Sequence, residues 1–452
     1  MKRFWGFALA FALLSRFKVD SDLGWHIALG RYFLETGQIL RQDIFSWTMS
    51  GYEWGNYFFF YQVIVSVIFG KMGLVFAGLL FGAIGAIAVF LLLPKKVGLM
   101  ALLFIGFSLR LAYANLGIRP HMIAFLLFSL IFTMCVKRLY LDKKFLPVWF
   151  LIFVFWANIQ QSVFYGLLIF SAYIILDLLF YKQLKKKGLT GGLAVFAGIL
   201  GSVTSPYHVG VAKGAIFDLT GTKTWSSIAE WLPVVVYDIH LVIFGVCGVV
   251  FIFIVFKNFK KIHPPILLIS AFLFMVPFLA INFLSYWVAV FIFLSSRYLN
   301  FGVNLKGLNL KLAYFFIIVL LAVSYLDLYS RAVDSKDLRG AFTRDGYPVG
   351  ALAFIKQNGL TDRLFNMYQW GGFVEWQYPQ IKTFIDGRMT GWRTGGVYIL
   401  SDYLSIITQK DCSLVDKYNI KTALIDSDFK SNCFSGWNLV YSDEFSRVLV
   451  AN

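Results

Sequence analysis

The chain has 452 residues, of which 59% are hydrophobic and 14% charged, with a formal net charge of +17. Soluble domains carry about a quarter charged residues, so this composition excludes an ordinary soluble protein. Residues 331–452 hold 14 basic and 13 acidic residues, so the positive excess lies elsewhere, in short loops between apolar stretches. That placement orients membrane helices and argues against nucleic acid as a partner.

Apolar stretches long enough to cross a bilayer recur along residues 1–330, and we predict a polytopic α-helical membrane protein with about eleven spans. The predicted spans are 4–18, 74–94, 97–114, 120–136, 145–159, 163–181, 189–205, 238–256, 264–280, 282–297 and 312–330. With this count every basic loop faces one side, which the positive-inside rule assigns to the cytoplasm. The N-terminus is then cytoplasmic, and the first outer loop, at 19–56, and the C-terminus lie outside. The first stretch resembles a signal peptide but lacks a clear cleavage site, so we interpret it as a retained helix.

Two further segments complete the predicted organisation. Residues 57–70 are apolar, but counting them as a span would reverse all later basic loops, so we predict a re-entrant or interfacial helix packed beneath the first outer loop. Residues 331–452 are more polar and predict an extracytoplasmic α/β domain. Its expected strands lie at 381–386, 421–426 and 447–450, and Cys412 and Cys433 could form a disulfide there.

The first outer loop carries the densest group of chemically useful side chains. Asp20 and Asp22 could together hold a divalent cation such as Mg²⁺ or Mn²⁺, or one could act as a base. Asp22 and His26 share one face of a helix expected at 23–36, which Gly37 ends. The alternatives stay open: the aspartates could begin the helix, and His26 could be an interfacial or hydrogen-bonded residue. An apolar stripe suited to a helix on the membrane surface is formed by Trp25, Leu29 and Phe33.

Other polar side chains are predicted at the same outer level of the membrane. Such groups are costly at membrane depth and tend to face a cavity, although ordinary anchoring at the lipid headgroups is the alternative. They are Arg119, His121, Asn158, Gln160, Gln161, Tyr207, His208 and Glu230. In the C-terminal domain, Trp370 and Trp376 suit a carbohydrate-stacking or a core role, and Asp386 and Arg388 suit a buried ion pair.

The run D-x-x-W-H-x-A-x-G-R-x-x-L-x-T-G-x-I, followed by Asp43-Ile44-Phe45-Ser46, resembles the first periplasmic loop of bacterial GT-C-type membrane glycosyltransferases. These polyprenyl-phosphate-sugar-dependent enzymes include dolichyl-phosphate-mannose-protein-mannosyltransferase-like and Rgt-type relatives. The later R-P, W-x-N, S-P-Y and E-W motifs and the closing Y-x-W-G-G…F-I-D-G-R segment resemble one bacterial branch of that group. One departure is that residues 115–121 offer Arg119 and His121 where a second acidic residue is common.

The resemblance implies an inner-membrane enzyme that transfers a sugar from a polyprenyl phosphate to a glycan, lipid or protein acceptor on the outer face. It implies that Asp22, with Asp20 as the alternative, serves as the base or as a metal-associated residue. We further expect Arg119 or Arg31, with His121 nearby, to hold the donor phosphate. Two other classes remain open: a transporter or flippase of lipid-linked glycans, and a non-catalytic envelope assembly protein.

Overall fold

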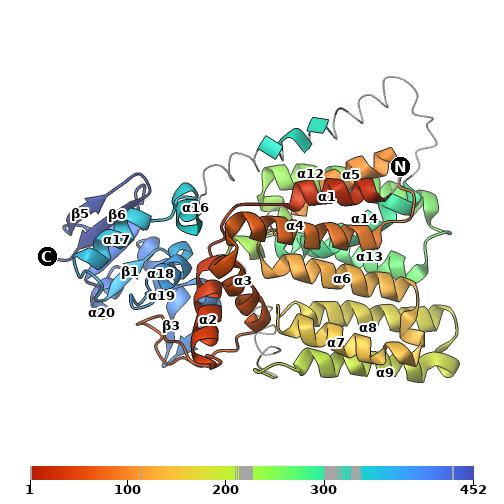
Figure 1. The fold of residues 1–452 in the computed structure, drawn as a ribbon, viewed down its shortest axis with the longest axis horizontal. Helices are drawn as coiled ribbons and strands as arrows, with labels where there is room; N and C mark the ends of the chain where they lie inside the picture. Colours follow the sequence, from red (N-terminus) through yellow and green to blue (C-terminus); the bar gives the residue numbers. More distant parts are fainter. Residues whose placement is uncertain are drawn as a thin grey trace. The chain divides into compact units, whose positions relative to one another are not determined.

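The computed structural model describes residues 3–112, 115–208, 210, 212, 228–299, 315, 318–319, 321–323, 325–326, 337–429 and 432–452. Within these residues the chain forms two compact units, shown in Figure 1. The helical unit takes its described residues from 1–17, 75–215 and 225–330, and the mixed unit takes them from 18–74 and 331–452. The first outer loop and the segment at 57–70 therefore belong to the same unit as the C-terminal residues, a grouping that the sequence division at 331 does not anticipate.

Long apolar helices build the helical unit. They are α1 (Phe4–Leu14), α4 (Gly73–Leu92), α5 (Leu99–Leu111), α6 (Pro120–Val136), α7 (Leu146–Ala157), α8 (Val163–Phe180), α9 (Leu184–Val203), α12 (Asp238–Asn258), α13 (Pro264–Met275) and α14 (Leu284–Tyr298). In the described part of the chain, α4, α8 and α12 are long and apolar enough to cross a membrane. Every predicted span up to residue 297 overlaps one of these helices, and the predicted span at 312–330 lies largely outside the described residues. The helices indicate a membrane-associated protein, and eleven crossings stay a prediction.

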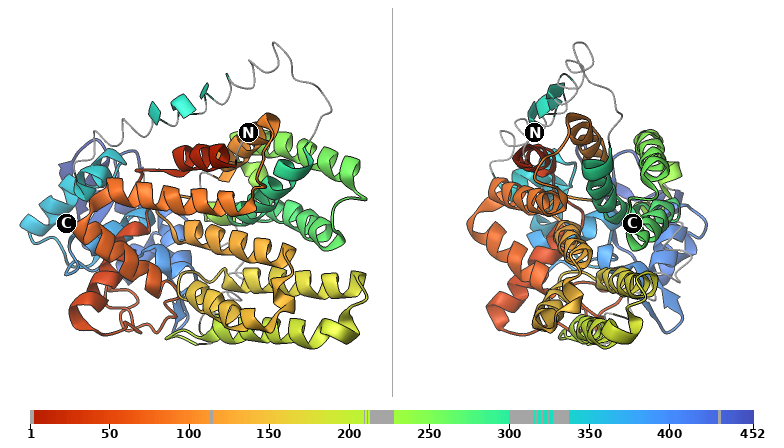
Figure 2. Two further views of the ribbon diagram at one scale, coloured as in Figure 1. Left: turned by 45° about the vertical axis from the view of Figure 1, so that its right-hand side comes forward. Right: turned by 90° about the vertical axis from the view of Figure 1, so that its right-hand side faces the viewer.

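The core of the helical unit lies around α14, whose residues 284–296 are all buried. Helices α5, α6, α12 and α13 pack against it. Helices α7, α8 and α9 run side by side, as both views in Figure 2 show in yellow and yellow-green. A helix that is apolar on all sides is covered on all sides by protein or lipid. The close packing of these helices therefore agrees with the lack of a polar face in their sequences.

A small mixed sheet with helices forms the C-terminal part of the mixed unit. Its strands are β1 (Leu364–Asn366), β4 (Thr422–Asp426), β5 (Asn438–Ser442) and β6 (Ser446–Val450), in the order β1-β4-β6-β5. β1 pairs parallel with β4, and the other two pairings are antiparallel. The accompanying helices are α16 (Leu338–Arg344), α17 (Val349–Gln357), α18 (Gly371–Gln377), α19 (Ile399–Ile407) and α20 (Ser413–Lys417). A Cys412–Cys433 disulfide joins the start of α20 to the turn before β5.

Two of the three predicted strands are confirmed, and the third, at 381–386, is wrong. Among those residues only Thr383 forms a bridge, and it pairs with Ser46 of the first loop and not with the sheet. The Thr383 N–H donates to the Phe45 carbonyl at 3.0 Å, and the Trp47 N–H donates to the Thr383 carbonyl at 3.1 Å. An apolar extended run looks the same in sequence whichever partner it pairs with.

The first-loop helix α2 (Leu23–Thr36) has the predicted bounds and ends at Gly37, whose φ is 69°. On one side it packs against α3 (Phe59–Lys71), in agreement with the packing predicted for residues 57–70. The Ser66 hydroxyl donates to the Ile27 carbonyl at 2.9 Å. On its other side α2 meets α18 at Gly24, where an added Cβ would lie only 2.1 Å from the Gly372 carbonyl oxygen.

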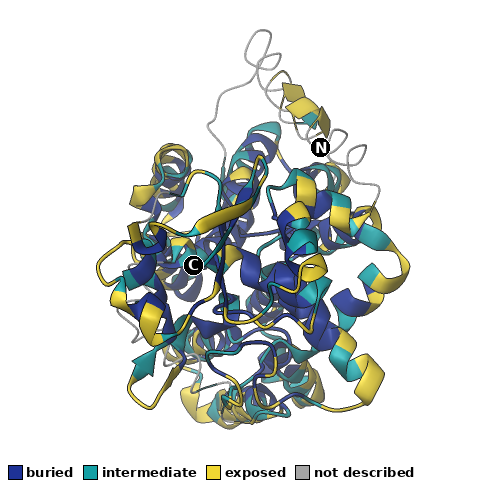
Figure 3. Ribbon diagram, turned by 90° about the vertical axis from the view of Figure 1, so that its left-hand side faces the viewer, coloured by how far each residue is buried: buried dark blue, intermediate teal, exposed yellow. Residues whose placement is uncertain are grey.

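The prediction that α2 lies on the membrane surface is wrong for its first two turns. All of its residues from Leu23 to Gly30 are buried within the protein. Trp25 and Leu29 belong to a core that also contains Phe45, so their apolar stripe faces the rest of the mixed unit. In Figure 3, helices of this unit alternate between buried and exposed positions along their length. Periodicity identifies an apolar face and does not identify what covers it.

Candidate functional site

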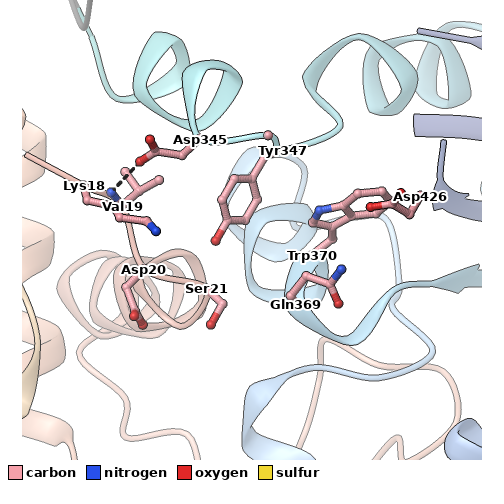
Figure 4. A pocket seen from close by; sticks show the side chains of 10 residues that line it. Lys18, Val19, Asp20, Ser21, Asp345, Tyr347, Gln369, Trp370 and Asp426 are labelled. Atoms are coloured by element: carbon pink, nitrogen blue, oxygen red, sulfur yellow. Dashed lines mark hydrogen bonds between the residues drawn. The ribbon is translucent and has the colours of Figure 1, made fainter. Parts of the chain in front are cut away.

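A polar cavity of about 390 Å³ lies within the mixed unit (Figure 4). Its walls come from the segment that precedes α2, the turn after α16, the turn before α18 and the end of β4. The lining residues are Lys18, Val19, Asp20, Ser21, Asp345, Gly346, Tyr347, Gln369, Trp370 and Asp426. Carboxylates, an ammonium, an amide, hydroxyls and an indole thus surround one space.

Hydrogen bonds fix the wall that joins the first loop to the C-terminal residues. The Val19 N–H donates to Oδ2 of Asp345 at 2.9 Å. The Arg344 guanidinium holds the same carboxylate, with Nε 3.0 Å from Oδ1. Asp345 is therefore a structural anchor whose charge is already offset by Arg344.

Asp20 and Asp22 have different surroundings. Oδ1 of Asp20 accepts the Asp22 N–H at 3.0 Å, a local hydrogen bond that is common just before a helix begins. The Asp20 side chain also lines the cavity. Oδ1 of Asp22 accepts the Trp25 indole N–H at 3.0 Å. That oxygen also lies against Gly387, where an added Cβ would be 2.0 Å away. Asp22 thus ties α2 to the C-terminal residues, and Asp20 is the carboxylate turned toward open space.

The other two predicted residues of α2 lie away from the cavity wall. His26 is 3% exposed, and its ring centroid lies 3.6 Å from that of Trp25 and 4.7 Å from that of Tyr61. These contacts are those of a histidine in an aromatic core. Arg31 is exposed further along α2. Among the described residues, no group of three or more His, Cys, Asp or Glu is placed to hold a metal ion, so a cation on Asp20 and Asp22 stays a prediction.

Three predicted site residues meet in the helical unit. Arg119 directly precedes α6, and its guanidinium pairs with the Glu230 carboxylate of a short 3₁₀ turn, Ala229–Trp231. His121, in the first turn of α6, has Nε2 2.8 Å from Oδ1 of Asn282. Burial would raise the pKa of Glu230, but the charges of Arg119 and His121 outweigh it and lower that pKa below its usual value. The carboxylate is therefore ionised at neutral pH.

The remaining predicted residues of the helical unit serve two turns. Asn158 is buried and donates to the carbonyls of Val154, at 2.8 Å, and Thr204, at 3.0 Å. The Gln160 side chain accepts from the Ser162 hydroxyl at 2.9 Å. Gln161 follows in the same turn, and Tyr207 and His208 lie in a turn just beyond Thr204. Asn158 thus brings the two predicted motifs together through structural hydrogen bonds.

A buried ionic cluster links the two motif-rich parts of the mixed unit. The Arg388 guanidinium contacts Asp386 at 2.7 Å, Glu375 at 3.0 Å and, from the first loop, Asp43 at 3.0 Å, and all four side chains are fully buried. Burial, reinforced by the charges of Asp386 and Asp43, raises the pKa of Glu375 well above its usual value although Arg388 opposes the shift. Glu375 therefore keeps its proton to a higher pH than an ordinary glutamate does.

No protein-family model matches the chain, and no curated protein matches it.

Several site residues were missed in the sequence. The Asp386–Arg388 pair is confirmed, and the structure adds Asp43 and Glu375 as partners of Arg388. Cavity residues Asp345, Gln369 and Asp426 were missed altogether. The one sequence signal for the cluster is that Asp43, Glu375 and Asp386 lie within otherwise apolar runs, which suggests that they are buried and paired. No sequence signal identified the cavity, because its walls come from segments more than 300 residues apart along the chain.

Proposed function

We propose that this protein is a membrane glycosyltransferase that moves a sugar from a polyprenyl phosphate to an envelope glycan, lipid or protein acceptor on the outer face of a bacterial inner membrane. The supporting observation is the meeting of Arg119, His121 and Glu230 beside the apolar helices of the helical unit. Ionisable groups at the ends of membrane helices mark sites for charged substrates. A lipid-borne phosphate is such a substrate, and Arg with His supplies the donors it needs.

In this proposal Arg119 binds the donor phosphate, with His121 as a second donor, and Glu230 holds the guanidinium in place before substrate arrives. The acceptor oxygen forms a bond to the anomeric carbon, the bond from that carbon to the phosphate oxygen breaks, and its electron pair leaves on the lipid phosphate. The hydroxyl proton passes to a carboxylate. Of the two aspartates expected to act as base, Asp22 is held by Trp25 and Gly387, so the proposal takes Asp20 for this role and makes no statement about its distance from Arg119.

The proposal retains the predicted orientation, with eleven spans, a cytoplasmic N-terminus and the mixed unit outside. The disulfide supports it, since such bonds persist in oxidising compartments. A transporter or flippase would require groups that bind the ligand on both membrane faces. A non-catalytic assembly protein would tolerate loss of Arg119.

The test is transfer by the full-length protein in lipid vesicles, supplied with polyprenyl phosphates that carry labelled mannose, glucose or N-acetylglucosamine and with envelope extract as acceptor. Arg119→Gln should lower kcat/KM by roughly 10²–10³-fold, the effect of losing one strong electrostatic contact in a transition state. Arg110→Gln, at an exposed arginine of the same unit, is the matched control and should transfer normally. Equal activity of the two variants would remove Arg119 from the mechanism.

The assignment of the base is tested with a second pair of variants. Asp20→Asn should abolish transfer, whereas Asp22→Asn should keep measurable transfer and lower thermal stability, because an amide can still face the Trp25 indole. If the two variants lose activity in the opposite order, Asp22 is the base and the assignment to Asp20 is wrong.

A further inference from the structure

The cavity of the mixed unit has the size and walls of a ligand site. Small-molecule sites have volumes of roughly 300–1,000 Å³, and this cavity, at about 390 Å³, lies at the small end of that range. In Figure 4 Asp20 and Ser21 face Tyr347 across it, and Gln369 and Trp370 close the far side. These residues come from four separate segments, so the fold, and not a single loop, makes the space.

One wall residue presents a hydrogen-bond donor for which the structure provides no acceptor. Trp370 is only 3% exposed, and no hydrogen bond of the described residues involves its indole N–H. In Figure 4 the indole nitrogen lies on the side that faces Tyr347, toward the cavity. The ring is buried, but its nitrogen is not among the buried unpartnered atoms of the described residues, so the N–H is accessible and can donate to an acceptor oxygen on a ligand.

The remaining polar groups define what else the ligand must offer. Gln369 makes no side-chain hydrogen bond within the described residues and can both donate and accept. The carboxylates of Asp20 and Asp426 accept only. A ligand that satisfies this set must carry several groups that each donate and accept, which is the chemistry of adjacent sugar hydroxyls.

Charge sets the class of saccharide. The lining carries the carboxylates of Asp20, Asp345 and Asp426 and the ammonium of Lys18, and Arg344 pairs with Asp345, so the formal charge of these groups together is negative. A phosphate or carboxylate placed among them would meet like charges, which disfavour binding. An ammonium group would be attracted. The donor phosphate therefore does not belong here.

We propose that this cavity binds a small saccharide that is neutral or carries an amino group. This binding does not depend on the proposed function. The indole N–H of Trp370 donates to a ring or hydroxyl oxygen, Gln369 bridges two hydroxyls, and Asp20 and Asp426 accept from hydroxyl or ammonium groups.

The experiment is calorimetric titration of the full-length protein in detergent with glucosamine, N-acetylglucosamine and glucosamine 6-phosphate. Glucosamine should bind most tightly and N-acetylglucosamine measurably, while the phosphate ester should bind at least about tenfold more weakly than glucosamine. Gln369→Ala should weaken both unphosphorylated sugars about tenfold. Asp426→Asn should weaken glucosamine more than N-acetylglucosamine, because only glucosamine carries the ammonium.

Matched controls are Gln357→Ala and Asp416→Asn, which change the same residue types at exposed positions of α17 and α20. Both should bind like the unchanged protein, and all four variants should melt within the same narrow range. The inference is overturned if no probe binds, if the phosphate ester binds as tightly as glucosamine, or if Gln357→Ala weakens binding as much as Gln369→Ala.

Binding and transfer fail separately in these experiments. Sugar binding in a protein that transfers no sugar from any donor would leave the saccharide site in place and refute the transferase. Transfer without sugar binding in the cavity would refute the site and leave the transferase in place.

Discussion

At the residue scale, Arg388 carries one positive charge among three buried carboxylates. Buried charges are costly unless they are paired, and three carboxylates around one guanidinium cannot all be ionised without excess negative charge. Protonation of Glu375 relieves that excess, and its Oε2 has no hydrogen-bond partner among the described residues. The cluster holds Asp43 of the first loop against the turn that contains Gly387, which in turn supports Asp22.

The raised pKa of Glu375 predicts a pH-dependent stability. The folded protein keeps a proton that the unfolded chain releases above about pH 4.3, so the free energy of unfolding falls as pH rises from there toward the raised pKa. Glu375→Gln keeps the neutral form and should lose this dependence, which amounts to as much as about 1.4 kcal/mol per pH unit. Melting temperatures of the unchanged protein and of Glu375→Gln, measured from pH 5 to 8, test this pH dependence. Parallel curves of melting temperature against pH would contradict the prediction.

Loss of the guanidinium should be more severe than loss of a carboxyl proton. Arg388→Met leaves the carboxylates of Asp43 and Asp386 buried without a counter-charge, which should destabilise the mixed unit by about 3–5 kcal/mol. Arg393→Met, at an exposed arginine of the same unit, is the matched control. Limited proteolysis of the two variants measures this loss of stability. Preferential cleavage within 331–452 is expected for Arg388→Met only.

At the residue scale, the pairing of Asp386 with Arg388 could be predicted from the sequence, because the two residues are only two positions apart on one turn. The sequence could not identify Asp43 as their partner, since that contact depends on how the first loop folds back. The same reason explains why Asp22, which looked like the better base by its place before Trp25, proved to be held by Trp25 itself.

At the element scale, α2 is held between α3 and α18 by backbone-to-backbone contacts. Gly24 and Gly30 permit these contacts: an added Cβ would lie 2.1 Å from the Gly372 carbonyl oxygen at the first and 2.1 Å from the Gln62 carbonyl oxygen at the second. The glycines in the motif letters around Trp25 and His26 are therefore packing residues. The bounds of α2 could be predicted because Gly37 and the aspartates punctuate them. Its partners could not, since a close-packed glycine looks like any other in sequence.

This packing predicts different outcomes for two glycine substitutions. Gly24→Ala should destabilise the protein by about 1–3 kcal/mol, because backbone atoms must move to admit the methyl group. Gly70→Ala, within α3, meets nothing within 4 Å and should be neutral or stabilise by about 0.4–1 kcal/mol. Thermal melting of both purified variants checks the pair, and equal losses would show that the close approach of α2 and α18 is not rigid.

At the scale of the whole molecule, the first outer loop and the C-terminal residues form one unit around one core. This grouping explains why the distinctive motifs lie in two places far apart in the chain: they make the two sides of one buried cluster and one cavity. Arg119 directly precedes the N-terminus of helix α6, and Arg138 lies just beyond its C-terminus. There Arg138 pairs with Asp177 of α8 at 2.9 Å. If α6 crosses the membrane, these two ionic sites lie on opposite faces.

The predicted orientation can be checked with the four cysteines. Cys412 and Cys433 are paired, and Cys135 and Cys247 are buried thiols. Membranes prepared without reductant and denatured in the presence of a maleimide polymer should gain two labels, and four after reduction, because an outer domain is oxidised in the cell. Four labels without reductant would place residues 331–452 in a reducing compartment and contradict the orientation.

Lipid-linked glycosyl transfer is tested most directly with a polyprenyl phosphate labelled separately in its sugar and its isoprenoid, supplied to the reconstituted protein in sealed vesicles. Our account predicts that the two labels separate: the sugar label moves to the acceptor while the isoprenoid label stays in the lipid as polyprenyl phosphate, and Arg119→Gln prevents the separation. Labels that remain joined with every donor, or that cross the bilayer together, would contradict glycosyl transfer and favour transport.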